Sequence, residues 1–231
     1  SQSFVSINNA ERLSAVELAR ELQNARLSPG GSPRWVTLTP LPKDEYSAEV
    51  RGIDLAKRMV TAKYLGADVI FASSVFHEQH GLLNRNGSPT LLFLPWRTVA
   101  IALQGARYQG AFNMPNKSTN HVFMRDDEAI VVVWNDEPTE EVIYLGEDVV
   151  ATDIWGRRIS LERDANTHRH TLRVGSSPMI LRKCNQQIAN WRLAAQFEIG
   201  KSRSEYGGHP DAVLGKNTFL QSVRGKAVLN V

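Results

Sequence analysis

The chain has 231 residues, of which 42% are hydrophobic and 22% are charged, as is usual for a globular protein. Its net charge of +3 comes from basic and acidic residues that are interspersed, so we expect no nucleic-acid partner. No apolar run has the length of a membrane span, and we expect no membrane partner. The only cysteine is Cys184, which excludes an internal disulfide and a cysteine-based metal site.

Predicted helices and short apolar strands alternate over residues 1–110. The expected helices span residues 10–25, 48–64 and 89–103, and the expected strands span residues 35–41 and 68–73. Asn8 and Asn9 are candidate caps for the first helix, and Pro89 is expected to open the third. This order is typical of a parallel sheet with crossover helices. Because two strands do not make a stable parallel sheet, residues 1–110 resemble the tail of a larger α/β domain.

Short strands with turn signals every eight to twelve residues follow. Residues 129–134 form an apolar, β-branched run that predicts a well-buried strand. Residues 153–157 predict a tight corner, because Gly156 can adopt a positive φ and Asp153 can accept hydrogen bonds from backbone N–H groups. We therefore predict an α+β protein: a partial α/β region, then an antiparallel β-sandwich over residues 111–187 and the first strands of a further β-sandwich over residues 188–231.

Several stretches together resemble a known family. They are residues 66–71 (GADVIF), 77–83 (HEQHGLL), 87–89 (GSP), 102–106 (ALQGA), 123–125 (FMR), 153–157 (DIWGR) and 177–180 (SPMI). They are similar to the last βα unit and the appended β-sandwich of the (β/α)8-barrel glycoside hydrolases of the large retaining clan. The resemblance covers about residues 34–182. It implies that residues 1–110 are βα units of an incomplete barrel, that the partner is a carbohydrate, that no cofactor or metal is needed, and that the location is extracellular or periplasmic.

The catalytic residues of that family are two carboxylates, about 5 to 5.5 Å apart in retaining enzymes. The family's nucleophile is a glutamate at the end of the seventh strand, but here the matching strand ends with Leu38, Thr39 and Pro40. The nearest acids are Asp44 and Glu45, which are the catalytic candidates, although acids before a helix are more simply explained by the helix dipole. Three explanations stay open: other residues act in the intact protein, it is a non-hydrolysing relative, or the strand assignment is wrong by one unit.

Histidines and an acid follow the second predicted strand. His77, Glu78 and His80 are candidate substrate-binding residues, because barrel enzymes place their sites at the carboxyl ends of strands. The favoured alternative is a solvated loop, and the spacing of the two histidines matches a metal site only loosely. Trp134 and Trp155 are interpreted as core residues rather than sugar-stacking residues.

Two functional classes remain from the sequence. The chain is either the C-terminal segment of a glycoside-hydrolase-like protein, itself not catalytic, or a non-catalytic structural or glycan-binding β-sandwich protein. Whether the intact protein is an enzyme depends on sequence upstream of Ser1. The unpaired strand edges of an incomplete barrel favour association, so we expect a homo-oligomer. His168 and His170 are predicted to lie on the surface of a hairpin.

Overall fold

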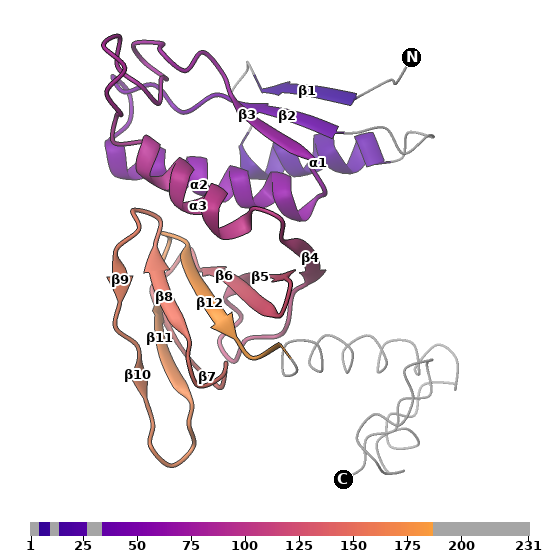
Figure 1. Ribbon diagram of the computed structural model, residues 1–231, viewed down its shortest axis with the longest axis vertical. Coiled ribbons are helices and arrows are strands. Elements are labelled where there is room, and N and C mark those ends of the chain that lie inside the picture. Colours follow the sequence, from indigo (N-terminus) through magenta and orange to yellow (C-terminus); the bar gives the residue numbers. More distant parts are fainter. Residues whose placement is uncertain (1–4, 10–13, 27–33, 187–231) are drawn as a thin grey trace.

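The computed structural model describes residues 5–9, 14–26 and 34–186 (Figure 1). Within these residues three helices accompany one parallel and two antiparallel sheets, which confirms the predicted α+β organisation. The expected further module over residues 188–231 lies outside the described residues. No helix in the described ranges is long and apolar enough to cross a membrane.

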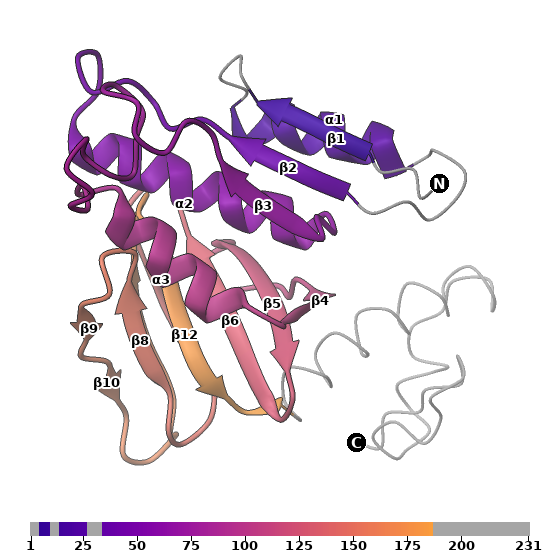
Figure 2. The same ribbon diagram turned by 45° about the horizontal axis from the view of Figure 1, so that its top comes forward.

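A three-stranded parallel sheet forms the first layer of the structure. Its strands pair in the order β1 (Val5–Asn9), β2 (Arg34–Leu38), β3 (Val69–Ala72). The helices are α1 (Ala15–Arg26), α2 (Ala48–Tyr64) and α3 (Phe93–Leu103). They lie on one face of this sheet, between it and the antiparallel strands (Figures 1 and 2). Side chains alternate along each strand, so Val36 and Leu38 of β2 are buried, whereas Phe71 of β3 is 44% exposed.

The prediction of only two parallel strands is wrong, because β1 adds a third. Asn8 and Asn9 belong to this strand and do not cap a helix. The helix begins later, at Ala15, where Ser14 and Glu17 form a reciprocal capping box. The Ser14 N–H donates to the Glu17 carboxylate at 2.8 Å, and the Glu17 N–H donates to the Ser14 hydroxyl at 3.2 Å.

The other two helices test the predicted boundaries. Helix α2 has the predicted bounds, and its N-cap Ser47 accepts a hydrogen bond from the Val50 N–H at 3.3 Å. Helix α3 begins at Phe93 and not at Pro89, because Pro89 forms an isolated bridge with Leu83 in the preceding loop. The start predicted at the proline is therefore four residues too early.

The antiparallel part consists of two sheets. The larger has the order β4-β5-β6-β12-β8-β9 and the smaller the order β10-β11-β7. Their strands are β4 (Arg107–Gly110), β5 (Thr119–Arg125), β6 (Glu128–Trp134), β7 (Thr139–Ile143), β8 (Val150–Asp153), β9 (Arg158–Ile159), β10 (Glu162–Arg163), β11 (His170–Val174) and β12 (Met179–Cys184). The buried strand predicted over residues 129–134 is confirmed as β6, which lies between β5 and β12.

Strand β6 contributes to two hydrophobic cores. Ile130 and Val132 join the core formed with the helices, whereas Val131 and Val133 join the core shared with the smaller sheet. The larger sheet therefore lies between the helices and the smaller sheet. All four of these side chains are fully buried.

The predicted corner after β8 is confirmed. Gly156 has a φ of +83°, and one carboxylate oxygen of Asp153 accepts hydrogen bonds from the N–H groups of Trp155 and Arg157, each at 2.9 Å.

The prediction that His170 lies on the surface is wrong, since its side chain is only 4% exposed. His170 begins β11 at an inward-facing position, in register with Ile143 of β7.

Candidate functional site

The carboxyl ends of β2 and β3 bring two loops together at one edge of the parallel sheet (Figure 2). Thr39 and Ser73 directly follow these strands, and their hydroxyl oxygens lie 2.7 Å apart. Ligands of α/β folds commonly bind at this edge, because the loops that leave the strands converge there. We define the rim as residues 39–46 and 73–90.

Buried and half-buried side chains hold the two loops of the rim together. Arg51 of α2 is 9% exposed and donates to the carbonyls of Leu41 and Gln79, both at 2.7 Å. Burial lowers the pKa of this guanidinium, and the nearby Asp44 carboxylate opposes that effect. The His80 ring lies with Nδ1 2.8 Å from the Pro40 carbonyl oxygen. A carbonyl only accepts hydrogen bonds, so Nδ1 carries the proton and His80 positions the loop.

An open pocket of about 290 Å³ lies beside these contacts. Glu78 lines it between two cations, with its carboxylate 3.7 Å from the Lys43 ammonium and 3.9 Å from the Arg85 guanidinium. The His77 ring also lines it, with ring centroids of His77 and His80 4.8 Å apart. The pocket thus combines aromatic faces with charged hydrogen-bonding groups, a combination suited to polar ring-shaped ligands.

Phe76 has no role among the predictions from the sequence. This side chain lines the same pocket and is 57% exposed, an unusual exposure for a phenylalanine. Its position directly before His77, in a loop that follows a strand, is the sequence signal that points to it.

The catalytic candidates Asp44 and Glu45 occupy a different part of the rim. Both are exposed and lie in the turn before α2, whose N-cap is Ser47 and whose first-turn acid is Glu49. They therefore precede the helix rather than belonging to its first turn. Glu78 is the acid that the structure places beside the pocket.

The two tryptophans singled out in the sequence pack against the core formed with the helices. A Cβ atom built on Gly52 of α2 would lie 2.7 Å from the Trp155 ring, so the indole covers this glycine closely. Trp134 lies under the Lys57 ammonium, 5.8 Å from the ring centroid. Both rings are partly buried at the junction of helices and antiparallel strands.

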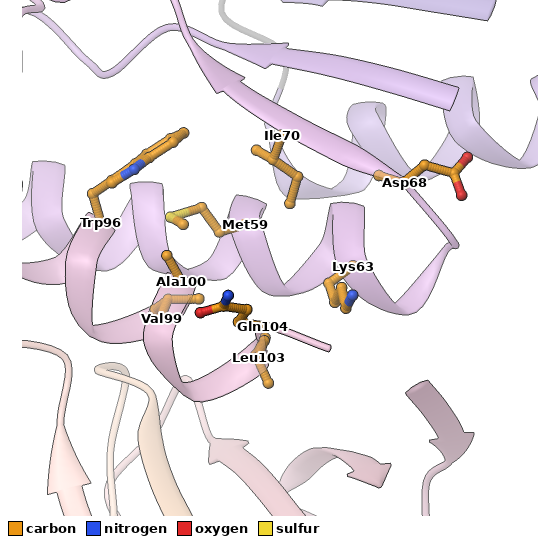
Figure 3. Close-up of a pocket in the computed structure, with 10 residues that line it drawn as sticks. Met59, Lys63, Asp68, Ile70, Trp96, Val99, Ala100, Leu103 and Gln104 are labelled. Carbon is orange, nitrogen blue, oxygen red and sulfur yellow. The ribbon is translucent and has the colours of Figure 1, made fainter. Parts of the chain in front are cut away.

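A second groove lies between β3, α2 and α3, as Figure 3 shows. Its volume is about 200 Å³. Met59, Ile70, Val99 and Leu103 supply apolar walls, Trp96 closes one end, and the polar side chains that line it are Lys63, Asp68 and Gln104. The groove is mostly apolar and adjoins the edge of β3 that pairs with no other described strand.

No protein-family model matches the chain, and no curated protein matches it. Solved structures do match. A family 39 glycoside hydrolase from Bacteroides cellulosilyticus WH2 has 15% identity and a TM-score of 0.56, covering 71% of this chain and 37% of that one. A family 30 subfamily 8 xylanase from Clostridium acetobutylicum has 15% identity and a TM-score of 0.54, covering 78% of this chain and 48% of that one.

A family 30 endoxylanase from Clostridium papyrosolvens C71 has 12% identity and a TM-score of 0.54, covering 79% of this chain and 49% of that one. The chain thus spans less than half the length of these three structures. Identities this low establish the fold alone. The resemblance seen in the sequence is confirmed at that level: the chain has a glycoside hydrolase-like fold.

Proposed function

We propose that the chain is the C-terminal segment of a glycoside-hydrolase-like, carbohydrate-active protein. In this proposal residues 1–110 are the last βα units of a (β/α)8 barrel, residues 111–187 are its β-sandwich, and residues 188–231 begin a further sandwich. The parallel order β1-β2-β3 with helices on one face supports the barrel assignment, as does the length of the matching hydrolases.

The observation that carries the carbohydrate assignment is the pocket at the rim. Phe76 offers an exposed ring for stacking on a sugar, while Glu78 and Arg85 offer hydrogen bonds to hydroxyl groups. His77 lines the pocket, and His80 holds its loop against Pro40. We propose that Phe76, His77 and Glu78 contact the sugar and that His80 positions them.

We further propose that the segment itself does not hydrolyse glycosides. Retaining chemistry needs two carboxylates about 5 to 5.5 Å apart, one as nucleophile and one as acid/base. Strand β2 ends at Leu38 and is followed by Thr39 and Pro40, so no carboxylate stands at that strand end. Glu78, the acid at the pocket, is engaged by Lys43 and Arg85, and no second carboxylate among the described residues lines the pocket beside it.

Binding to soluble xylan, measured by affinity electrophoresis and calorimetry with the full chain, tests the carbohydrate assignment. Phe76→Ala should weaken binding about tenfold, because stacking on an aromatic ring supplies much of the affinity of an open site. Leu91→Ala is the matched control, since Leu91 is 63% exposed outside the pocket. Equal binding by the two variants, or no binding to xylan or to a panel of other glycans by the parent chain, would contradict the assignment.

Turnover of aryl glycosides by the purified chain tests the non-catalytic assignment. The expected rate equals the uncatalysed background, and Asp44→Asn, Glu45→Gln and Glu78→Gln should leave it there. Activity that any of these substitutions abolishes would show that the segment carries its own catalytic carboxylate.

The alternative function is that of a structural or glycan-binding β-sandwich protein. The hydrogen bonds within the rim favour this alternative. Arg51 and His80 bind backbone carbonyls, so these side chains hold the loops together. The chain extended upstream of Ser1 separates the alternatives. Hydrolysis by the extended protein supports the enzyme segment, and glycan binding without hydrolysis supports the module.

We also propose that the isolated chain forms a homo-oligomer through β3. Its outer edge has no strand partner among the described strands, and Val69 and Phe71 are 37% and 44% exposed beside it. Such an edge pairs readily with another chain. Light scattering at micromolar concentration should give a dimer or larger species, and Ile70→Pro, which removes a backbone donor, should lower the mass. A monomeric parent chain would overturn this proposal.

A further inference from the structure

The two antiparallel sheets leave a cavity between them that the proposed carbohydrate site does not involve. It lies where β9, at the edge of the larger sheet, crosses to β10, at the edge of the smaller sheet (Figure 1). Its volume of about 530 Å³ falls within the range of small-molecule sites. Aliphatic side chains line much of it, namely Val149, Val150, Ala151, Ile159 and Leu161.

The charged side chains around this cavity are Arg158 of β9, Arg163 of β10 and Glu147 of the loop before β8. Arg163 pairs with the Glu147 carboxylate, and its Nη2 lies 2.6 Å from Nδ1 of His168. Both contacts use Nη2. A guanidinium has five N–H donors in a planar fork, so Nε and Nη1 provide further donors for an anion. The lining contains two arginines and one glutamate, so its net charge is positive and the cavity is electropositive.

His170 also lines the cavity, at a position where the strand pattern calls for an apolar side chain. The inward-facing residues of β11 are His170, Leu172 and Val174, and all three are buried. Nδ1 of His170 is shielded from solvent and has no hydrogen-bond partner. Burial, aided by the charge of Arg163, lowers the pKa of this imidazole, so the ring is neutral at pH 7. The imidazole thus contributes a neutral polar group to the wall of a cavity that is otherwise lined by aliphatic and charged side chains.

The side chains exclude one ligand class and favour another. No phenylalanine, tyrosine or tryptophan lines this cavity, so it lacks the stacking platform that a neutral sugar needs. Aliphatic walls suit a hydrocarbon body, and the arginines suit an anionic head. We propose that the cavity binds a small amphiphilic carboxylate, whose head pairs with Arg163 and whose body contacts Val149, Ile159 and Leu161.

Octanoate, used below its micelle concentration, is the probe, and octanol is the matched neutral ligand. Titration of the full chain is followed by calorimetry and by the NMR signals of the Val150, Ala151 and Ile159 methyl groups. Octanoate should saturate and shift these signals. Octanol should bind about tenfold more weakly, because it lacks the charge-assisted hydrogen bonds.

Arg163→Gln and Arg173→Gln form the matched pair of variants. Each arginine pairs with a glutamate, Arg163 with Glu147 and Arg173 with Glu162, but only Arg163 lines the cavity. Arg163→Gln should weaken octanoate binding about tenfold or more, and Arg173→Gln by less than about twofold. Ser160→Trp, at an exposed residue that lines the cavity, should fill it and abolish binding while β6 stays folded by NMR.

The proposal is overturned if octanoate shifts no cavity methyl group up to millimolar concentration. It is also overturned if octanol binds as tightly as octanoate, or if the two arginine variants lose equal affinity. None of these results bears on xylan binding at the rim, because the two sites share no residue.

Discussion

Strands β3 and β6 differ in how far other parts of the chain cover them, both along their edges and over their faces. Within the described residues β6 has a strand partner on each side, and Ile130 and Val131, which point to opposite faces, are both fully buried. Among the described strands, β3 has a partner on one side only, and Val69 and Phe71 are substantially exposed. Among the described residues, the larger antiparallel sheet is therefore covered on both faces, whereas the parallel sheet is covered only by its helices.

This difference indicates which part of the protein needs a partner. Parallel sheets are normally buried on both faces, because crossover helices and further strands enclose them. The apolar residues on the open face of β3 are thus suited to burial that the described residues do not provide. The same substitution should therefore have unequal effects in the two sheets.

The largest expected effect is the difference between Phe123→Ala and Phe71→Ala. Phe123 of β5 is fully buried beneath the helices, so its truncation should lower the free energy of unfolding by about 3 to 5 kcal/mol. Phe71 is 44% exposed and contacts Trp35 edge-on, with ring centroids 5.8 Å apart. Its truncation should cost about 1 kcal/mol in the monomer.

Denaturant unfolding at low protein concentration measures both values. If the proposed association through β3 buries Phe71, the cost of Phe71→Ala should rise with protein concentration, whereas that of Phe123→Ala should not. If Phe71→Ala and Phe123→Ala cost the same at every protein concentration, the open face of the parallel sheet has no special role.

The second prediction concerns His121, where β5 meets α2. Its ring stacks on Tyr64 at 4.2 Å between centroids, and burial lowers its pKa to about 4. Unfolded histidine has a pKa near 6.5, so the unfolded chain takes up a proton more readily. Stability from this residue is complete above pH 6.5 and falls as the pH drops toward 4, by about 3 kcal/mol in total.

The control for this effect is His121→Phe, which keeps an aromatic ring against Tyr64 and cannot titrate. Unfolding free energies of both proteins are compared from pH 7 to pH 4. The difference between them should shrink or reverse in favour of the variant as the pH falls. Parallel pH profiles would contradict a buried, neutral His121.

How far the sequence predicts this structure depends on where the stabilising contacts lie. The β6 strand, the Gly156 corner and helix α2 follow from local patterns, because their apolar periodicity and turn residues agree with the final fold. Strand β1 does not follow from a local pattern. Asn8 and Asn9 also suit a helix cap, and the parallel pairing with β2 that makes them part of a strand is non-local. The Ser14–Glu17 capping box was the local signal that could have corrected it.

The candidate site was predictable only in part. His77, Glu78 and His80 are candidates because they follow a strand, and His77 and Glu78 line one pocket; their role in binding stays a prediction. The loop contact between His80 and Pro40 joins residues forty positions apart, which no local pattern reveals. His170 was misplaced for a related reason: its exposure depends on how β11 pairs with β7.

A third prediction tests the contact between Trp155 and Gly52, which joins the antiparallel sheet to α2. Gly52→Ala would place a Cβ atom 2.7 Å from the indole, so the ring must shift, at a cost of about 1 to 3 kcal/mol. Trp155→Ala should itself cost about 3 kcal/mol, because the ring packs against the core. In the Trp155→Ala background the Gly52→Ala cost should disappear, as a double-mutant cycle would show. If the costs of the two substitutions simply add, Gly52→Ala does not clash with the Trp155 ring. If Trp155→Ala leaves the denaturation midpoint unchanged within error, Trp155 is not a core residue.

The smallest effect is expected at Arg125, which ties the end of α3 to β5. Its Nη1 donates to the carbonyls of Ile101, Ala102 and Gln104, at 3.1, 3.3 and 3.3 Å. These carbonyls belong to the last turn of the helix, where a cation also complements the helix dipole. Arg125→Gln should therefore lower the free energy of unfolding by about 1 to 2 kcal/mol.

Arg157→Gln is the matched control for this last change. Arg157 pairs with Asp153 at 2.6 Å but is 76% exposed, so its loss should cost less than about 1 kcal/mol. Hydrogen exchange of the last α3 amides sharpens the comparison. Arg125→Gln should speed their exchange while the β6 amides keep their protection, because the bond acts where the helix ends and not within the central sheet. Equal loss of protection in α3 and β6 would mean that the helical layer and the central sheet open only together.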